Sequence, residues 1–273
     1  MLKVFLSVGA LQLVSMFVMM LRTKGLALLL GPEQYGLMAA VDRLVAVFAQ
    51  TASMSLPFAA LRYLSPLWHA DRAAYLDLLK RMRNVMVTFI GVAFAVGMAL
   101  TWIDPVILGG DVARNRVLAT LALAGLPVVA LVPFLQNTVA SSFAHNRAML
   151  FVLAHAVVIT VASLGGVALW GLPGFYALYA VLGGGLVFLV LRWVQRRPKV
   201  VPLEDDAGKR QASQADRRSL AATATWTPGP GIMRYLPPSV WRFCLLLLPS
   251  AFLAPAVAYS VFYQVLSAYG NRM

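Results

Sequence analysis

Five charged side chains stand in or beside two apolar stretches near the start of the chain: Arg22, Lys24, Asp42, Arg43 and Arg62. An ionisable side chain at membrane depth costs about 2.5 to 3.5 kcal/mol on insertion scales, so it usually faces a protein interior or a water-filled cavity. An arginine in such a cavity can pair bidentately with phosphate oxygens, because it stays charged when partly buried. A carboxylate there can hold a coupling cation. The pattern therefore predicts an anion-binding cavity that contains one acidic group.

Helical positions at about 100° per residue separate the two basic residues of the first stretch. Arg22 lies about 20° from Ser15 and continues a polar stripe, whereas Lys24 lies about 200° from Arg22. We therefore expect Arg22 to face an interior and Lys24 to extend its long stem towards the outer headgroups. The alternative for Arg22 is an anchor at the outer membrane interface.

The second stretch also has one polar face. Arg43, Gln50 and Ser53 fall within about 100° of Asp42, and Arg62 lies on the opposite side, where it suits an interfacial anchor. An Asp42–Arg43 ion pair that joins two helices is an open alternative to a cavity. The predicted site residues are thus Arg22, Arg43 and Gln50 for substrate binding and Asp42 for ion coupling.

The elements that must position these residues are membrane helices. The chain is 60% hydrophobic and 12% charged, with a mean hydropathy of +0.77, which excludes an ordinary soluble domain. A bilayer core of about 30 Å takes about 20 apolar residues per helix, and helices satisfy their own backbone polar groups there. The prediction is an all-α polytopic membrane protein. Its seven apolar stretches are 2–21, 35–64, 85–103, 117–143, 150–170, 175–194 and 241–269.

Prolines lie inside several of these stretches, where they interrupt backbone pairing and permit bending. They are Pro57, Pro127, Pro133, Pro249 and Pro255. Bendable helices suit alternating access in a transporter, although static kinks in a helical bundle are an equal alternative.

Composition divides the chain into three parts. Residues 1–194 form a predicted six-helix N-terminal transmembrane bundle, and residues 195–239 carry the mixed charge, Gly and Pro of a flexible cytoplasmic linker. Residues 240–273 read as the first helix of a second, truncated bundle. Because many transporters are built from two repeats, we expect either a missing C-terminal half or pairing with a second chain.

Lys and Arg residues are unequally distributed between the two sides of this predicted bundle. With the N-terminus inside, sixteen fall on the cytoplasmic side and at most five on the other, as the positive-inside rule requires. The expected location is the cell inner membrane, multi-pass, with a cytoplasmic N-terminus. The net charge of +13 predicts anionic membrane lipids as partners and no nucleic acid.

The sequence offers no sign of covalent chemistry. It has one cysteine, and it shows neither a phosphate-binding Walker loop nor the Gly-x-Ser-x-Gly or His-Glu-x-x-His patterns of hydrolases. We predict no enzyme activity, no cofactor and no metal.

Residues 30–37 read LGPEQYGL, and residues 55–64 read SLPFAALRYL. With Arg22 before them, these segments resemble the start of polysaccharide flippases, members of the multidrug/oligosaccharidyl-lipid/polysaccharide exporter superfamily. The resemblance implies two six-helix bundles in a V, which move undecaprenyl-pyrophosphate-linked oligosaccharide across the membrane by alternating access. It also implies that Arg22 holds the pyrophosphate, whereas Arg43 matches no family position. Glycan polymerases or glycosyltransferases are the implied partners.

Other functions remain open. A cation-coupled multidrug extruder would have the same fold, but such extruders carry more acidic residues in the cavity. A membrane-embedded glycan polymerase or acyltransferase should place catalytic residues in a long outer loop, whereas the predicted loop 171–174 is short. A non-transporting fragment is the last alternative.

Overall fold

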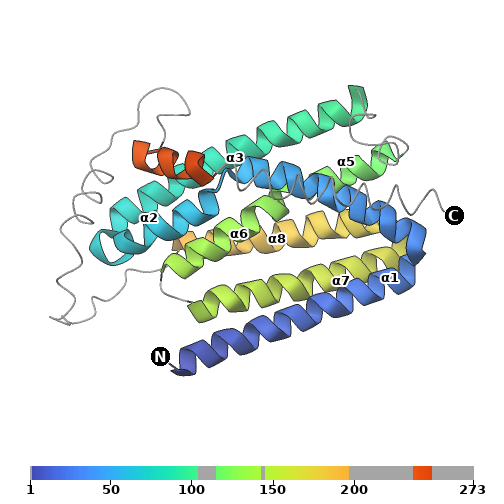
Figure 1. The fold of residues 1–273 in the computed structure, drawn as a ribbon, viewed down its shortest axis with the longest axis horizontal. Coiled ribbons are helices and arrows are strands. Elements are labelled where there is room, and N and C mark those ends of the chain that lie inside the picture. Colours follow the sequence, from blue (N-terminus) through green and yellow to red (C-terminus); the bar gives the residue numbers. More distant parts are fainter. Residues whose placement is uncertain (1, 104–114, 143–144, 197–235, 248–273) are drawn as a thin grey trace.

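The computed structural model describes residues 2–103, 115–142, 145–196 and 236–247. Every regular element in these ranges is a helix (Figure 1). Four of the continuous helical stretches are long and apolar enough to cross a membrane, so the all-α polytopic membrane fold is confirmed. The elements are α1 Leu2–Ser53, α2 Leu56–Ala70, α3 Arg72–Ile103, α5 Arg116–Ala124, α6 Leu126–Ser141, α7 His145–Leu178, the π-helix η2 Tyr179–Gly183 and α8 Gly184–Arg196.

Helix α1 is two membrane helices joined at a sharp turn. Its 52 residues would extend about 78 Å if straight, more than twice the bilayer core. Gly31 breaks it with φ 70° and ψ 173°, a conformation that is open to glycine and costly for other residues. Pro32 then begins the next helix, where its missing N–H does no harm. The two halves fold back on each other at the predicted connection (Figure 1).

Helix α7 is divided in the same way. Trp170 and Gly171 leave the helical conformation, so one span ends there and the next continues through η2 into α8. Gly166 and Gly174 lie on either side of this turn, and a Cβ at Gly166 would stand 2.5 Å from the Gly174 carbonyl oxygen. Only glycine permits this close approach of the two backbones.

Two predicted spans, 35–64 and 117–143, are each divided into two helices in the structure, because a new helix begins at a proline inside each of them. Met54 and Ser55 have φ values of 45° and 59°, and α2 starts directly afterwards with Pro57 in its first turn. Gly125 likewise separates α5 from α6, which has Pro127 in its first turn. Proline suits the first turn because it has no N–H to pair and its φ is already helical.

The other three prolines were also expected to bend spans. Pro133 lies within α6, whereas Pro249 and Pro255 lie outside the described residues.

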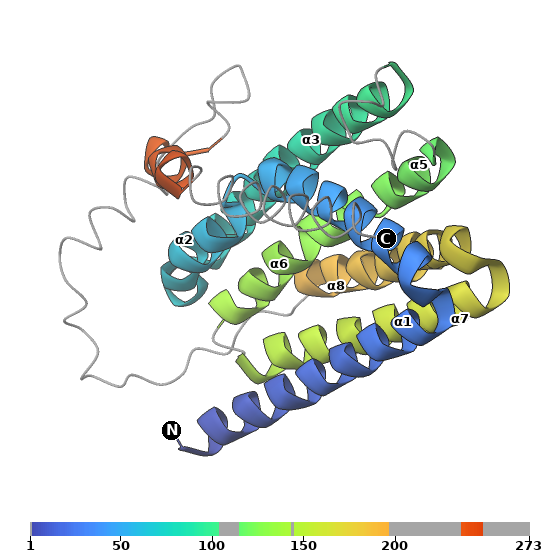
Figure 2. The ribbon, with the colours of Figure 1, turned by 45° about the vertical axis from the view of Figure 1, so that its right-hand side comes forward.

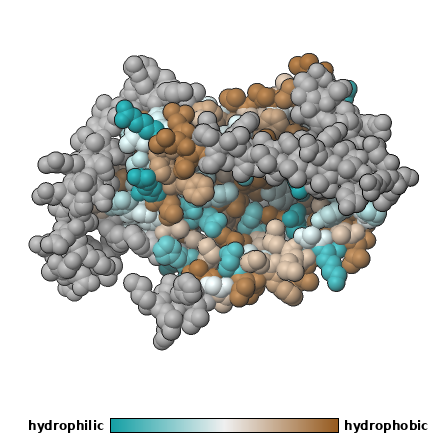
Figure 3. Space-filling view, viewed as in Figure 1, coloured by the Kyte–Doolittle hydropathy of each residue, from teal (hydrophilic) through white to brown (hydrophobic). Residues whose placement is uncertain are grey.

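Helix packing and the outer surface both fit a membrane bundle. The first half of α1 runs beside α7 in both ribbon views (Figure 1 and Figure 2). Many large apolar side chains of the described helices are exposed, and on the face shown in Figure 3 hydrophobic residues lie beside hydrophilic ones. Leu28 and Ile103 are 77% and 84% exposed, which would be unfavourable in water and is favourable against lipid.

A short helix, Pro238–Leu247, packs against α2 through the Tyr63–Phe243 ring contact and against α3 through the Phe89–Trp241 ring contact. The Tyr63 hydroxyl donates to the Ser239 carbonyl at 3.0 Å, and the Arg62 guanidinium carbon lies 4.9 Å from the centre of the Phe243 ring. Arg62 is exposed, as an interfacial anchor would be. The rest of the predicted segment 240–273 and residues 197–235 of the predicted linker lie outside the described residues, so this division stays a prediction.

Candidate functional site

Helices from early and late parts of the described chain line a partly open cavity of about 260 Å³. The two halves of α1, together with α5, α6, α7 and η2, contribute to its walls. Its lining is apolar except for one cation, one carboxylate and two tyrosines. The lining residues are Met19, Arg22, Asp42, Val45, Ala122, Val129, Ile159, Phe175, Tyr176 and Tyr179.

Arg22 is oriented by α7. Its Nε donates to the Ser163 hydroxyl at 2.9 Å, and that hydroxyl in turn donates to the Ile159 carbonyl. The guanidinium carbon lies 5.6 Å from the centre of the Phe175 ring. Because Nε already donates to Ser163, the two terminal guanidinium nitrogens are the donors that can bind an anion.

Asp42 is also held by α7. Its carboxylate accepts a hydrogen bond from the Tyr176 hydroxyl at 2.9 Å, and the same hydroxyl lies 3.3 Å from the Met38 carbonyl. Arg22 lines the same cavity. The site therefore presents one positive and one negative group in a largely apolar cavity.

An aromatic wall completes the cavity. Phe175 stacks on Tyr179, with ring centres 6.2 Å apart and an 18° interplanar angle. Tyr179 is the first residue of η2, and π-turns of this kind occur frequently at functional sites. Flat aromatic faces can pack against sugar rings or the apolar part of an amphiphile.

The structure separates the other sequence-predicted residues from this cavity. Arg43 is half-buried and Gln50 is exposed, and neither is among the described residues that line the cavity. Lys24 is exposed. Arg22 and Asp42 are thus the two predicted site residues that the structure brings together.

The sequence missed the part of the site contributed by α7 and η2: Ser163, Phe175, Tyr176 and Tyr179. Helical positions on two consecutive helices cannot show which later helix packs across from them. The spacing of Phe175, Tyr176 and Tyr179 was the available signal, because positions i, i+1 and i+4 lie on one side of a helix.

The chemistry of this arrangement is binding and charge pairing. Within the described ranges, no group of three or more His, Cys, Asp or Glu side chains could hold a metal ion. A guanidinium fork, a carboxylate and an aromatic wall can bind an anion that is attached to a bulky neutral group.

Of the comparisons with known proteins, the search of solved structures supports the fold. Neither a scan of protein-family models nor a search of curated proteins gives a match. Among solved structures, the chain is similar to a MOP superfamily transporter from Pyrococcus furiosus Vc1, described as having a binding pocket of reverse polarity, with TM-score 0.56 and 15% identity. It is also similar to the outward-facing conformation of a multidrug resistance MATE family transporter of that superfamily, with TM-score 0.57 and 14% identity.

Both alignments cover 90% of this chain and 52% of the other. The chain therefore has the fold of about half of a MOP superfamily transporter.

Proposed function

We propose that the chain forms one six-helix half of a transporter that moves undecaprenyl-pyrophosphate-linked oligosaccharide across the cell inner membrane. The supporting observation is the orientation of Arg22, whose Nε is held by Ser163 while the side chain lines a cavity. Transport proceeds by alternating access with a second six-helix half and without covalent chemistry. Glycosyltransferases and a glycan polymerase act before and after it.

A lipid-linked pyrophosphate needs a fixed cation on its path, because a bare anion in a bilayer is strongly disfavoured. Arg22 supplies that cation and pairs with phosphate oxygens through its terminal nitrogens. The exposed Gln50 and the half-buried Arg43 follow Asp42 on the second half of α1 and contact the substrate outside this cavity. Asp42 couples movement to an ion gradient.

A cation-coupled multidrug extruder is the second candidate. The Asp42 carboxylate lines the cavity beside Phe175 and Tyr179, an arrangement that suits a cationic aromatic compound. One of the similar solved structures is a multidrug resistance transporter. Arg22 opposes this candidate, since its charge repels cations from the same cavity.

Glycan export in a strain that lacks its own flippase tests the proposal, with the whole gene supplied. Arg22→Ala abolishes export at unchanged expression, because the pyrophosphate loses its fixed cation. Arg22→Lys restores only part of it, since an ammonium cannot pair bidentately.

Lys24→Ala is the matched control, because this exposed residue lies two positions away and carries the same charge. It leaves export at the wild-type level. Equal export by Arg22→Ala and Lys24→Ala would refute the assignment of Arg22.

A further inference from the structure

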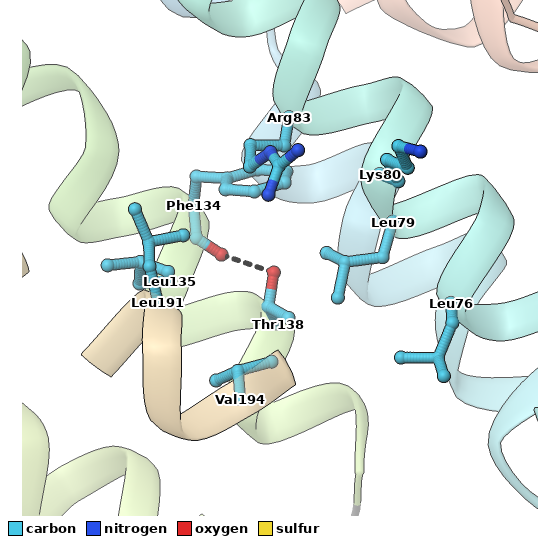
Figure 4. Close-up of a pocket in the computed structure, with 9 residues that line it drawn as sticks. All are labelled: Leu76, Leu79, Lys80, Arg83, Phe134, Leu135, Thr138, Leu191 and Val194. Carbon is cyan, nitrogen blue, oxygen red and sulfur yellow. Dashed lines mark hydrogen bonds between the residues drawn. The ribbon is translucent and has the colours of Figure 1, made fainter. Parts of the chain in front are cut away.

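A second cavity, of about 320 Å³, lies between α3, α6 and α8. It shares no lining residue with the cavity around Arg22. In Figure 4, Leu79 and Arg83 of α3 extend towards the open space that separates them from Thr138 of α6. Lys80 also lines the cavity, and its exposed side chain lies over the α3 ribbon in this view. The second cavity is therefore independent of the proposed transport site.

The charge of this cavity is wholly positive in the described residues. Lys80 and Arg83 line it, and no carboxylate does. Three residues apart on one helix, the two cations lie on the same face. The nearby Asp77 is instead paired with Arg81 at 2.5 Å.

The Arg83 side chain is held in place by a hydrogen bond to its neighbour. Its Nη2 donates to the Asn84 side-chain oxygen at 3.1 Å, and the side chain is half-buried. Across the cavity, the Thr138 hydroxyl donates to the Phe134 carbonyl at 2.8 Å (Figure 4). Its oxygen still has lone pairs, but the other lining side chains are the two cations and apolar groups, including the Phe134 ring.

The segments that line the cavity lie at the end of the bundle where α1 begins (Figure 1). It is built from the beginning of α3 and the ends of α6 and α8. If the N-terminus is cytoplasmic, as the distribution of Lys and Arg predicts, this is the level of the inner-leaflet headgroups.

We infer that this cavity binds the phosphate of an acidic phospholipid from the inner leaflet. Lys80 and Arg83 hold the phosphate, and the first part of an acyl chain lies along Leu76, Leu191 and Val194. The volume is at the lower end of small-molecule pockets, so it accommodates a headgroup and the start of a chain rather than a whole lipid. Free inorganic phosphate shares the same chemistry but would not use the apolar wall.

Native mass spectrometry of the whole protein, purified and mixed with phosphatidylglycerol or phosphatidylcholine, tests this site. We expect phosphatidylglycerol to be retained and phosphatidylcholine to be lost. Lys80→Gln combined with Arg83→Gln weakens retention about tenfold. Inorganic phosphate, added in excess, does not displace the lipid.

Three further variants test whether lipid retention depends on the cavity itself. The alternatives are general attraction of the lipid to a basic surface and misfolding of the double variant. Arg81→Gln removes one positive charge from the neighbouring position, outside the cavity, and leaves retention unchanged, whereas Arg83→Gln alone removes one charge inside the cavity and lowers retention. Leu191→Trp fills the cavity without altering charge and lowers retention.

Equal loss of lipid in Arg81→Gln and in the Lys80/Arg83 double variant would show a diffuse electrostatic effect and overturn the site. Displacement of the lipid by inorganic phosphate, equal retention of phosphatidylcholine, or full retention by Leu191→Trp would overturn it as well.

Discussion

Arg22 and Asp42 carry opposite charges on the wall of one cavity, and a hydroxyl of α7 orients each of them. Ser163 accepts from Arg22, and Tyr176 donates to Asp42. The proposed function gives the two groups separate roles: the cation binds the substrate, and the carboxylate binds the coupling ion. The two roles can be tested by changing charge and hydrogen bonding independently.

Asp42→Asn removes the charge but keeps a side-chain oxygen that can accept from Tyr176. We predict that gradient-driven export falls about tenfold or more, while the thermal stability of the purified protein changes little. Export assays and thermal unfolding in detergent measure the two effects.

Tyr176→Phe is the complementary variant, since it leaves the Asp42 charge and removes the 2.9 Å hydrogen bond. Its expected effect is smaller, at about 0.6 kcal/mol of stability, the average for polar contacts between membrane helices. Wild-type export by Asp42→Asn would exclude Asp42 as the coupling site.

Sequence alone indicates which polar residues turn inward, because membrane helices cannot expose them cheaply to lipid. That reasoning selected Arg22 and Asp42, which line the cavity, but also Arg43 and Gln50, which are not among its described lining residues. It could not supply the partners of the first two, since Ser163 lies 141 positions after Arg22 and Tyr176 lies 134 positions after Asp42. Only the packing of α1 against α7 makes these pairs neighbours.

At the scale of the elements, backbone chemistry explains both the correct and the wrong predictions of where helices begin and end. Gly31 and Gly171 break α1 and α7 at connections that the apolar stretches predicted. Pro57 and Pro127 begin new helices, whereas the sequence suggested only bends within continuous spans. A proline's local effect is readable from sequence, but whether a helix bends or ends depends on tertiary packing.

The close approach of Gly166 and Gly174 fixes the turn between the two spans of α7. Gly166→Val would force a Cβ to 2.5 Å from the Gly174 carbonyl oxygen, and overpacking of this kind costs about 1 to 3 kcal/mol or more. We predict a clear fall in thermal stability in detergent, with loss of export.

Gly165→Val is the control for this substitution, because a Cβ at Gly165 meets nothing within 4 Å. It carries the same helix-propensity change without the backbone clash. Equal melting temperatures for the two variants would contradict the packing argument.

At the scale of the whole molecule, the helix turns define which connections share a side of the membrane. We predict that Glu33 lies outside the cell membrane and Asp71 inside, because one span separates them. Both residues are exposed. Cysteine placed at either position, in a Cys244→Ala background, should be labelled from outside only at position 33 by a membrane-impermeant maleimide. Labelling of position 71 alone would reverse the topology.

The proposed flippase and the alternative drug extruder are both compatible with the fold, which is similar to about half of a MOP superfamily transporter. Ligand binding therefore distinguishes the two proposals. The most direct measurement is the affinity of the whole purified protein for a polyprenyl-pyrophosphate oligosaccharide, with ethidium as a cationic competitor.

The predicted result is saturable binding of the glycan lipid that ethidium does not displace. Arg22→Ala weakens this binding about tenfold or more, whereas Lys24→Ala retains it. Ethidium binding that requires Asp42, together with glycan-lipid binding unaffected by Arg22→Ala, would contradict the proposed function.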